Sequence, residues 1–102
     1  MKIVKPLRVR EYARAHTAAG SNLDRWLILT KTAEWTDFKD VKNSFSGADA
    51  VQVGTGRTVV VFNISGNKFR LITAIHYEIG KVFVLCFLTH AEYSKDNWKK
   101  EL

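Results

Sequence analysis

The chain has 102 residues, 46% of them hydrophobic, so it has enough apolar side chains for one buried core and we expect a single domain. Sixteen Lys and Arg against ten Asp and Glu give a net charge of +6, which favours a polyanionic partner such as nucleic acid, a membrane surface or an acidic protein. A single cysteine, Cys86, excludes a disulfide framework, and no His, Cys, Asp or Glu cluster has the spacing of a metal site.

The distribution of charge and the length of the apolar segments limit which binding partners and which cellular location we expect. The excess of cations lies in residues 1–20 and 51–102, while residues 21–50 are close to neutral. The sequence contains neither the apolar core of a signal peptide nor a run of about 18 apolar residues. We therefore expect a cytoplasmic, soluble protein with no membrane partner, no metal and no small-molecule cofactor.

The first half of the chain predicts helices. After a short candidate strand at residues 1–4, Pro6 is suited to the first turn of a helix that runs to about Thr17. Ser21 or Asn22 is expected to cap a second helix, with an apolar stripe that packs on a sheet: Leu23, Trp26, Leu27, Thr30 and Ala33. Residues 36–41 predict a further short helix whose inward side chains are Phe38, Val41 and Phe45.

The second half predicts strands at residues 58–64, 69–77 and 82–88, separated by short turns. Such short connections favour antiparallel pairing. With the first strand they make an α+β domain: two to three N-terminal helices on one face of a small, mainly antiparallel, four-stranded sheet, followed by a short C-terminal helix. Alternation along residues 69–77 places Phe69 and Leu71 toward the core, and Lys68 and Arg70 on an open face that suits a phosphodiester backbone.

Two motifs then carry a family resemblance. The run Asn63-Ile-Ser-Gly-Asn-Lys-Phe-Arg-Leu-Ile72, followed by Thr89-His-Ala-Glu-Tyr-Ser-Lys95, resembles the HigB-type (host inhibition of growth) toxins of bacterial toxin–antitoxin pairs, within the wider RelE-like group. The middle helix with its tryptophans and the element Phe45, Ala48 and Asp49 are similar as well. The resemblance implies that residues 1–102 form one RelE-like toxin domain of the microbial ribonuclease-like type.

The resemblance also implies an activity and partners. It implies a type II toxin that cleaves mRNA on the ribosome without a metal, inhibits translation and growth, and is neutralised by a helix-turn-helix, HigA-like antitoxin. Carried over to this chain, the catalytic positions are Lys68, Arg70, His90, Tyr93 and Lys95. The chain departs from the family pattern at Leu85, where relatives often carry a basic residue, and at Ser94, where an acidic residue often follows the tyrosine.

The chemistry of RNA cleavage explains the choice of residues. A base must take the proton of the 2′-hydroxyl, cations must stabilise charge on the phosphate, and an acid must protonate the leaving 5′-oxygen. His90 suits either proton role near neutral pH, while Tyr93 suits proton transfer or stacking on a base. The sequence leaves open which of the two transfers protons.

Two functions remain as alternatives: a ribosome-dependent endoribonuclease, and a non-catalytic module that binds RNA or the ribosome through the same basic face. Both need cations that contact the RNA, for which we expect Lys5, Arg8, Lys68, Arg70 and Lys99.

Overall fold

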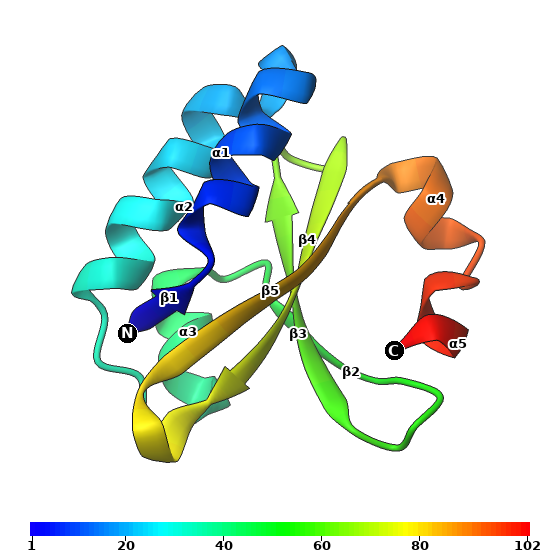
Figure 1. The fold of residues 1–102 in the computed structure, drawn as a ribbon. Helices are drawn as coiled ribbons and strands as arrows, with labels where there is room; N and C mark the ends of the chain where they lie inside the picture. The colour runs from blue at the N-terminus through cyan, green and yellow to red at the C-terminus, as the bar shows by residue number, and fades with distance from the viewer.

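The computed structural model describes all residues, 1–102, as one sheet with helices on both sides (Figure 1). The five strands are β1 (Lys2–Val4), β2 (Asp49–Gln52), β3 (Thr58–Ile64), β4 (Phe69–His76) and β5 (Lys81–Thr89), arranged in the order β1-β5-β4-β3-β2. β1 pairs with β5 in parallel and every other pair is antiparallel. The predicted α+β class and the mainly antiparallel sheet are confirmed.

The N-terminal helices cover one face of the sheet. They are α1 (Pro6–Ala15), α2 (Gly20–Thr32) and α3 (Phe38–Ser44), and Pro6 occupies the first turn of α1 as predicted. Asp37 caps α3 by accepting a hydrogen bond from the Asp40 backbone N–H at 3.1 Å. The predicted cap at Ser21 or Asn22 is wrong: α2 follows directly on the 3-10 turn Thr17–Ala19 and has no side-chain cap.

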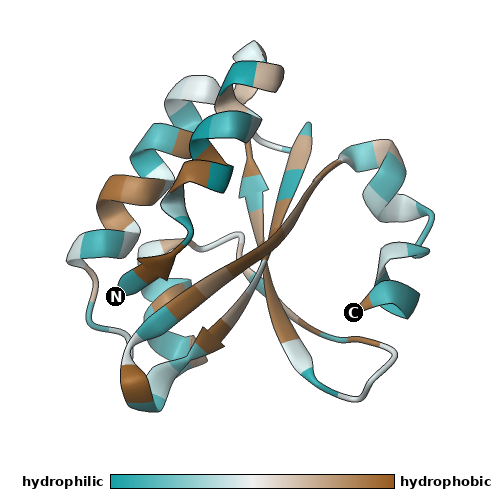
Figure 2. Ribbon diagram, viewed as in Figure 1, coloured by the Kyte–Doolittle hydropathy of each residue, from teal (hydrophilic) through white to brown (hydrophobic).

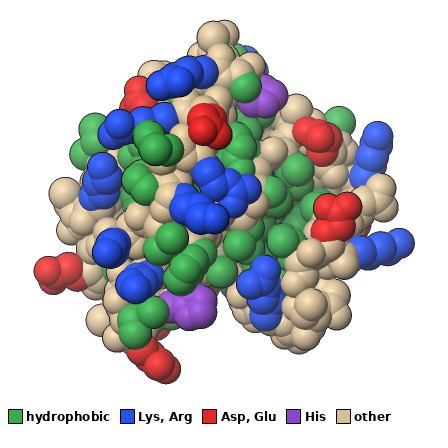
Figure 3. Space-filling view, viewed as in Figure 1, with side chains coloured by type: hydrophobic (Ala, Val, Ile, Leu, Met, Phe, Trp, Pro, Cys, Tyr) green, Lys and Arg blue, Asp and Glu red, His purple; other side chains and the backbone are tan.

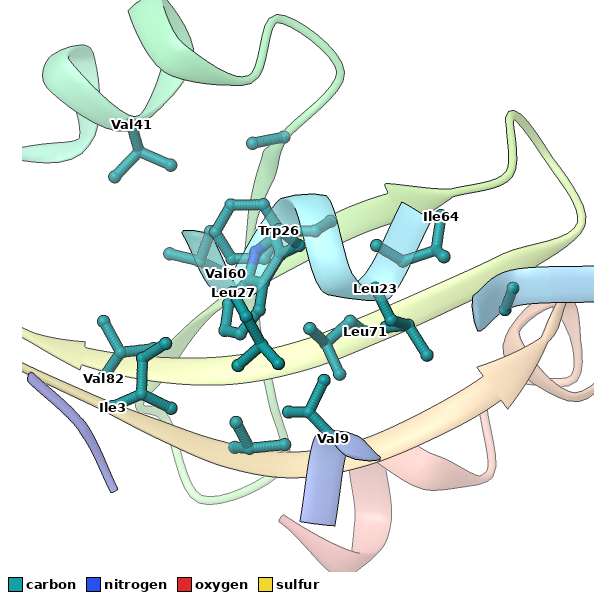
Figure 4. Packing of buried hydrophobic residues seen from close by; sticks show 14 of the residues in the cluster. Ile3, Val9, Leu23, Trp26, Leu27, Val41, Val60, Ile64, Leu71 and Val82 are labelled. Carbon is teal, nitrogen blue, oxygen red and sulfur yellow. The ribbon is translucent and has the colours of Figure 1, made fainter. Parts of the chain in front are cut away.

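The main core lies between these helices and the sheet (Figure 4). Leu23, Trp26, Leu27 and Thr30 of α2 are all buried, which confirms the predicted apolar stripe. Hydrophobic residues run along most of β5 and recur in the other strands, whereas the helices alternate between hydrophilic and hydrophobic segments (Figure 2). Burial of side chains of this size contributes about 1.5–3 kcal/mol each to folding, so this layer fixes the position of the sheet.

The count of strands and C-terminal helices differs from the prediction. The sheet has five strands, since residues 49–52 pair with residues 58–61 of β3 as β2. The C-terminal segment forms two short helices, α4 (His90–Ser94) and α5 (Trp98–Glu101). Tyr77 lies in the 3-10 turn Tyr77–Ile79 that follows β4 and is not part of the strand. Three of the four β2 residues are exposed and the fourth, Val51, is half-buried, so this short edge strand gives little apolar signal.

The second face of the sheet is covered as well, which corrects the prediction of an open face. Trp98 of α5 packs there on Ile72 of β4 and on three valines, Val53, Val59 and Val61. Arg70 shares this face and is only 8% exposed. The strand run Ile72-Thr73-Ala74 is buried on both sides, and such a continuous apolar run is typical of a strand between two layers.

Candidate active site

Arg70 lies in β4, where its Cα pairs with Asn63 of β3 and Leu88 of β5. Its guanidinium donates to the Phe69 carbonyl oxygen at 3.1 Å and to Oδ1 of Asn67 at 3.4 Å. These contacts hold a buried cation in one orientation. An arginine has five N–H donors, so a phosphate still finds free donors on the same fork.

His90 is positioned by the junction of β5 and α4. Thr89 ends the strand and caps the helix: its hydroxyl accepts from the Glu92 N–H at 3.2 Å, and the Glu92 carboxylate accepts from the Thr89 N–H at 3.0 Å. The backbone N–H of His90 donates to the Lys68 carbonyl oxygen at 2.9 Å, which ties this junction to the β3–β4 turn. The cap also lowers the pKa of Glu92, because the backbone and hydroxyl of Thr89 stabilise the carboxylate.

The imidazole of His90 faces the guanidinium of Arg70. Its Nδ1 lies 3.4 Å from Nη2 of Arg70. Because a guanidinium only donates, Nδ1 is the acceptor in this contact, and the proton of the neutral ring is on Nε2. The side chain of His90 is otherwise exposed, so it is open to a substrate.

Tyr93 lies one helical turn after His90 and completes the group. The Cζ of Arg70 is 5.3 Å from the centroid of the Tyr93 ring, a cation–π arrangement. The other side of the site is held by Trp98, which stacks on Tyr93 with ring centroids 5.2 Å apart and donates from Nε1 to the Tyr93 carbonyl oxygen at 3.0 Å. Partial burial raises the pKa of the Tyr93 hydroxyl and the charge of Asp49 raises it further, so Tyr93 is a neutral phenol at ordinary pH.

Two further side chains belong to this surface although the sequence did not assign them to it. Asn67 lies in the turn between β3 and β4 and accepts from Arg70. Asp49 starts β2 and pairs with Val61, which pairs with Ile72, so Asp49 is on the Arg70 side of the sheet. The available signals were the place of Asn67 in the Asn63–Ile72 motif and of Asp49 in the family-like element with Phe45.

The remaining predicted residues lie around this group or apart from it. Lys68 is exposed at the end of the β3–β4 turn and Lys95 is exposed at the end of α4, beside His90 and Tyr93 in the chain. Lys99 is held by Asp96 at 3.3 Å and lies over the Trp98 ring. These three cations border the site, whereas no contact joins the exposed Lys5, at the start of α1, to it.

Arg8 has a different position from the one expected. It donates from Nη1 to the Val84 carbonyl oxygen at 2.9 Å and from Nη2 to the Leu85 carbonyl oxygen at 3.0 Å. Leu85 has no partner in β4 because the register shifts there, so it forms a bulge in β5. The fork of Arg8 thus binds the bulged backbone, and a role for Arg8 in RNA binding stays a prediction.

The surface around β5 combines apolar and cationic side chains. On the face shown in Figure 3, a group of Lys and Arg side chains lies in the middle, with hydrophobic side chains exposed on both sides of it. No three His, Cys, Asp or Glu side chains lie close enough together to hold a metal ion. None of the helices has the length and apolar character needed to cross a membrane.

A family model described as a RelE-like toxic component of a toxin–antitoxin system matches residues 19–96. The chain belongs to this family, the HigB toxins. The match includes α2, the whole antiparallel part of the sheet and α4, and therefore Arg70, His90 and Tyr93. A comparison with curated proteins finds no match.

Proposed function

We propose that this toxin is a metal-independent endoribonuclease that cleaves mRNA on the ribosome and so inhibits translation and growth. The observation that carries the proposal is the convergence of three side chains from two distant motifs: Nη2 of Arg70 lies 3.4 Å from Nδ1 of His90, and its guanidinium lies over the Tyr93 ring. A cation, an imidazole and a phenol are the groups that metal-free RNA cleavage needs.

Arg70 binds the scissile phosphate in this proposal. Its fork is held by the backbone of Phe69 and by Asn67, so little side-chain freedom is lost when a phosphate binds. Because the residue is nearly buried, its charge is poorly screened by water and acts strongly on the charge that develops in the transition state.

His90 acts as the general base. In the free protein its Nδ1 lone pair accepts from Arg70. A phosphate that draws Nη2 of Arg70 to itself releases Nδ1, which then takes the proton of the 2′-hydroxyl. The 2′-oxygen attacks phosphorus, the bond to the 5′-oxygen breaks, and the products are a 2′,3′-cyclic phosphate and a 5′-hydroxyl. Substrate binding and activation of the base are coupled by this exchange.

Tyr93 has the complementary role. Because the raised pKa keeps the phenol protonated near neutral pH, Tyr93 does not act as the base, and its hydroxyl gives its proton to the leaving 5′-oxygen. Its position is set from behind by Trp98, which fixes both the ring and the backbone of α4. This assigns the base to His90 and the donor to Tyr93.

The partners follow from the family and the charge. A toxic component of such a system implies an antitoxin, and we propose a helix-turn-helix, HigA-like protein. The net charge of +6 and the exposed Lys68 and Lys95 suit contacts with mRNA and the ribosome. We place the protein in the cytoplasm, where ribosomes are found.

The test is to induce the protein alone in bacteria and to record growth together with the 5′ ends of cellular mRNA. The proposal expects growth arrest and new mRNA ends. Both should be suppressed when the reading frame next to the toxin gene, which we expect to encode the antitoxin, is expressed together with the toxin. Growth arrest without new ends would instead support the non-catalytic module that binds RNA or the ribosome.

A further inference from the structure

A cavity of about 320 Å³ lies at the edge of the sheet, between α2, the loop Ser44–Ala48 and the β3–β4 hairpin. Beyond Val61, β3 has no strand on this side, because β2 pairs only with residues 58–61. The edge residues Phe62, Asn63 and Ile64 therefore form one wall, and Arg25 and Leu29 of α2 form the opposite one. Its volume lies at the lower end of the range for small-ligand sites.

Three polar side chains of the cavity keep groups that make no hydrogen bond within the protein. Arg25 is exposed and takes part in no ion pair or side-chain hydrogen bond, and the side chain of Asn63 makes no hydrogen bond either. Asn22 uses one donor, to the Ser65 hydroxyl at 2.9 Å, and its amide oxygen remains free. A cation and two amides around a cavity that the half-buried Phe45 also lines are a combination that suits a phosphate attached to a planar base.

The hairpin turn joins this cavity to the proposed active site. Asn63 is the cross-strand partner of Arg70, so the cavity begins one strand spacing, about 4.8 Å, from the β4 backbone. Gly66 lines the cavity, and the next residue, Asn67, accepts from Arg70. A single RNA strand that passes over the turn therefore reaches both places.

The turn itself is fixed in position. Ser65 adopts a left-handed conformation with φ 55°, and its hydroxyl donates to the Ala18 carbonyl oxygen at 3.0 Å while it accepts from Asn22. Gly47 lies against Asn63: it has no Cβ, and a Cβ there would come within 2.8 Å of Nδ2 of Asn63. The cavity thus has its shape before any ligand binds.

We propose that this cavity binds one nucleotide of the RNA, next to the phosphate held by Arg70, with Arg25 on its phosphate and Asn22 and Asn63 on the edge of its base. This inference rests on the proposed function and adds a determinant of base preference to it. A neutral hydrogen bond to the base contributes roughly two- to tenfold in affinity, and a charged one more.

Binding is tested without cleavage, by following the indole N–H signals of the three tryptophans in NMR spectra. Nε1 of Trp26, which lines the cavity, is buried and has no hydrogen-bond partner, so its signal reports on the cavity; Trp98, held by Tyr93, reports on the proposed active site. AMP, CMP, GMP and UMP are each titrated. We expect at least one to shift the Trp26 signal, and Arg25→Ala to weaken the binding measured at Trp26 about fivefold or more while leaving any titration of Trp98 unchanged. Arg10→Ala, the same change on α1, should have no effect.

Base preference is then read from mRNA ends produced by the wild type, Arg25→Ala, Asn63→Ala and the Arg10→Ala control. We expect both cavity variants to relax the preference at one position beside the cut, whatever their overall rate. No shift with any nucleotide, or an unchanged cleavage pattern, would overturn the inference. So would variants that cleave as the wild type does but escape the antitoxin, since the cavity would then belong to a protein interface. A wild type that binds nucleotides but cuts no RNA would refute the proposed function alone.

Discussion

The guanidinium of Arg70 lies over the ring of Tyr93 although the two residues are 23 positions apart in the chain: the guanidinium carbon lies 5.3 Å from the centre of the phenol ring. Neither residue reaches this position alone. Arg70 is directed by β4 and Tyr93 by α4, and the stack of Tyr93 on Trp98 keeps α4 against the sheet. The proposed active site thus depends on the C-terminal helices as much as on the strands.

Replacement of Arg70 tests the phosphate site. Arg70→Ala should abolish growth arrest, with a loss of about 10²–10³-fold in cleavage, and Arg70→Lys should be strongly impaired because it lacks the two-pronged fork. Growth and mRNA ends are measured beside thermal unfolding followed by circular dichroism. Since Arg70 is nearly buried, Arg70→Ala should also cost about 1–3 kcal/mol of stability and still fold. Wild-type activity of Arg70→Lys would count against a bidentate contact.

Replacement of His90 tests the base. His90→Ala should lower turnover by about a hundredfold or more, in line with general acid–base catalysis, and should leave the melting temperature nearly unchanged because the side chain is exposed. The backbone N–H that donates to Lys68 is retained in alanine. His76→Ala, another exposed histidine at the opposite end of β4, is the matched control. If His90→Ala remains as toxic as the wild type, the base must be another residue.

Replacement of Tyr93 separates its hydroxyl from its ring. Tyr93→Phe keeps the stack on Trp98 and the contact with Arg70, so stability should be retained while turnover falls by about tenfold or more. Single-turnover cleavage of ribosome-bound mRNA measures the chemical step. A variant as fast as the wild type would restrict Tyr93 to positioning, and Tyr93→Ala would then be the variant that loses activity.

Cys86 gives a prediction for pH dependence. Burial raises its pKa to about 11, so the native protein keeps the thiol protonated where an unfolded thiol, with a pKa near 8.5, ionises. The free energy of unfolding should therefore fall as pH rises from about 8.5 to 11, and Cys86→Ala should remove this part of the slope. Alkylation by iodoacetamide at about pH 8 should be at least tenfold slower in native than in urea-unfolded protein. Equal rates would show an accessible thiolate.

Removal of metal tests the class of mechanism. Cleavage should survive a chelator and leave a 2′,3′-cyclic phosphate or its 3′-phosphate product, because the 2′-oxygen is the nucleophile in the proposed reaction. Since chelators also strip magnesium from ribosomes, ribosome integrity is checked by sedimentation in the same samples. Products with 5′-phosphates and 3′-hydroxyls would point to attack by water and refute the roles given to His90 and Tyr93.

Local patterns predicted much of the fold. The spacing of Leu23, Trp26 and Leu27 identified α2 and its buried side, and the apolar runs with short turns identified β3, β4 and β5. β2 was missed because four residues at an edge, mostly exposed, have no periodicity that distinguishes them from a loop. Residues Asp49–Gln52 form a strand because they pair with β3.

The environment of the site was harder to predict than its members. Alternation correctly placed Arg70 and Leu71 on opposite faces of the sheet. The face that carries Arg70 was expected to be open, but Trp98 covers it, and the burial of Trp98 depends on how two short helices fold back onto the sheet. Ile72 and Ala74 on the same face were the sign that it is covered. The contact of Asn67 with Arg70 and the cavity beside Asn63 arise from tertiary packing, which spacing in one sequence does not report.

The hydrogen bonds of Arg8 to the bulge at Leu85 also affect the tendency of the protein to aggregate. β1 covers only the first three residues of β5, so the rest of that strand is a sheet edge, and free carbonyl and N–H groups along an edge invite pairing with other chains. The bulge bends this edge and Arg8 occupies two of its carbonyl groups. The bulge and Arg8 thereby make this hydrophobic strand a poor template for pairing with a second copy of the chain.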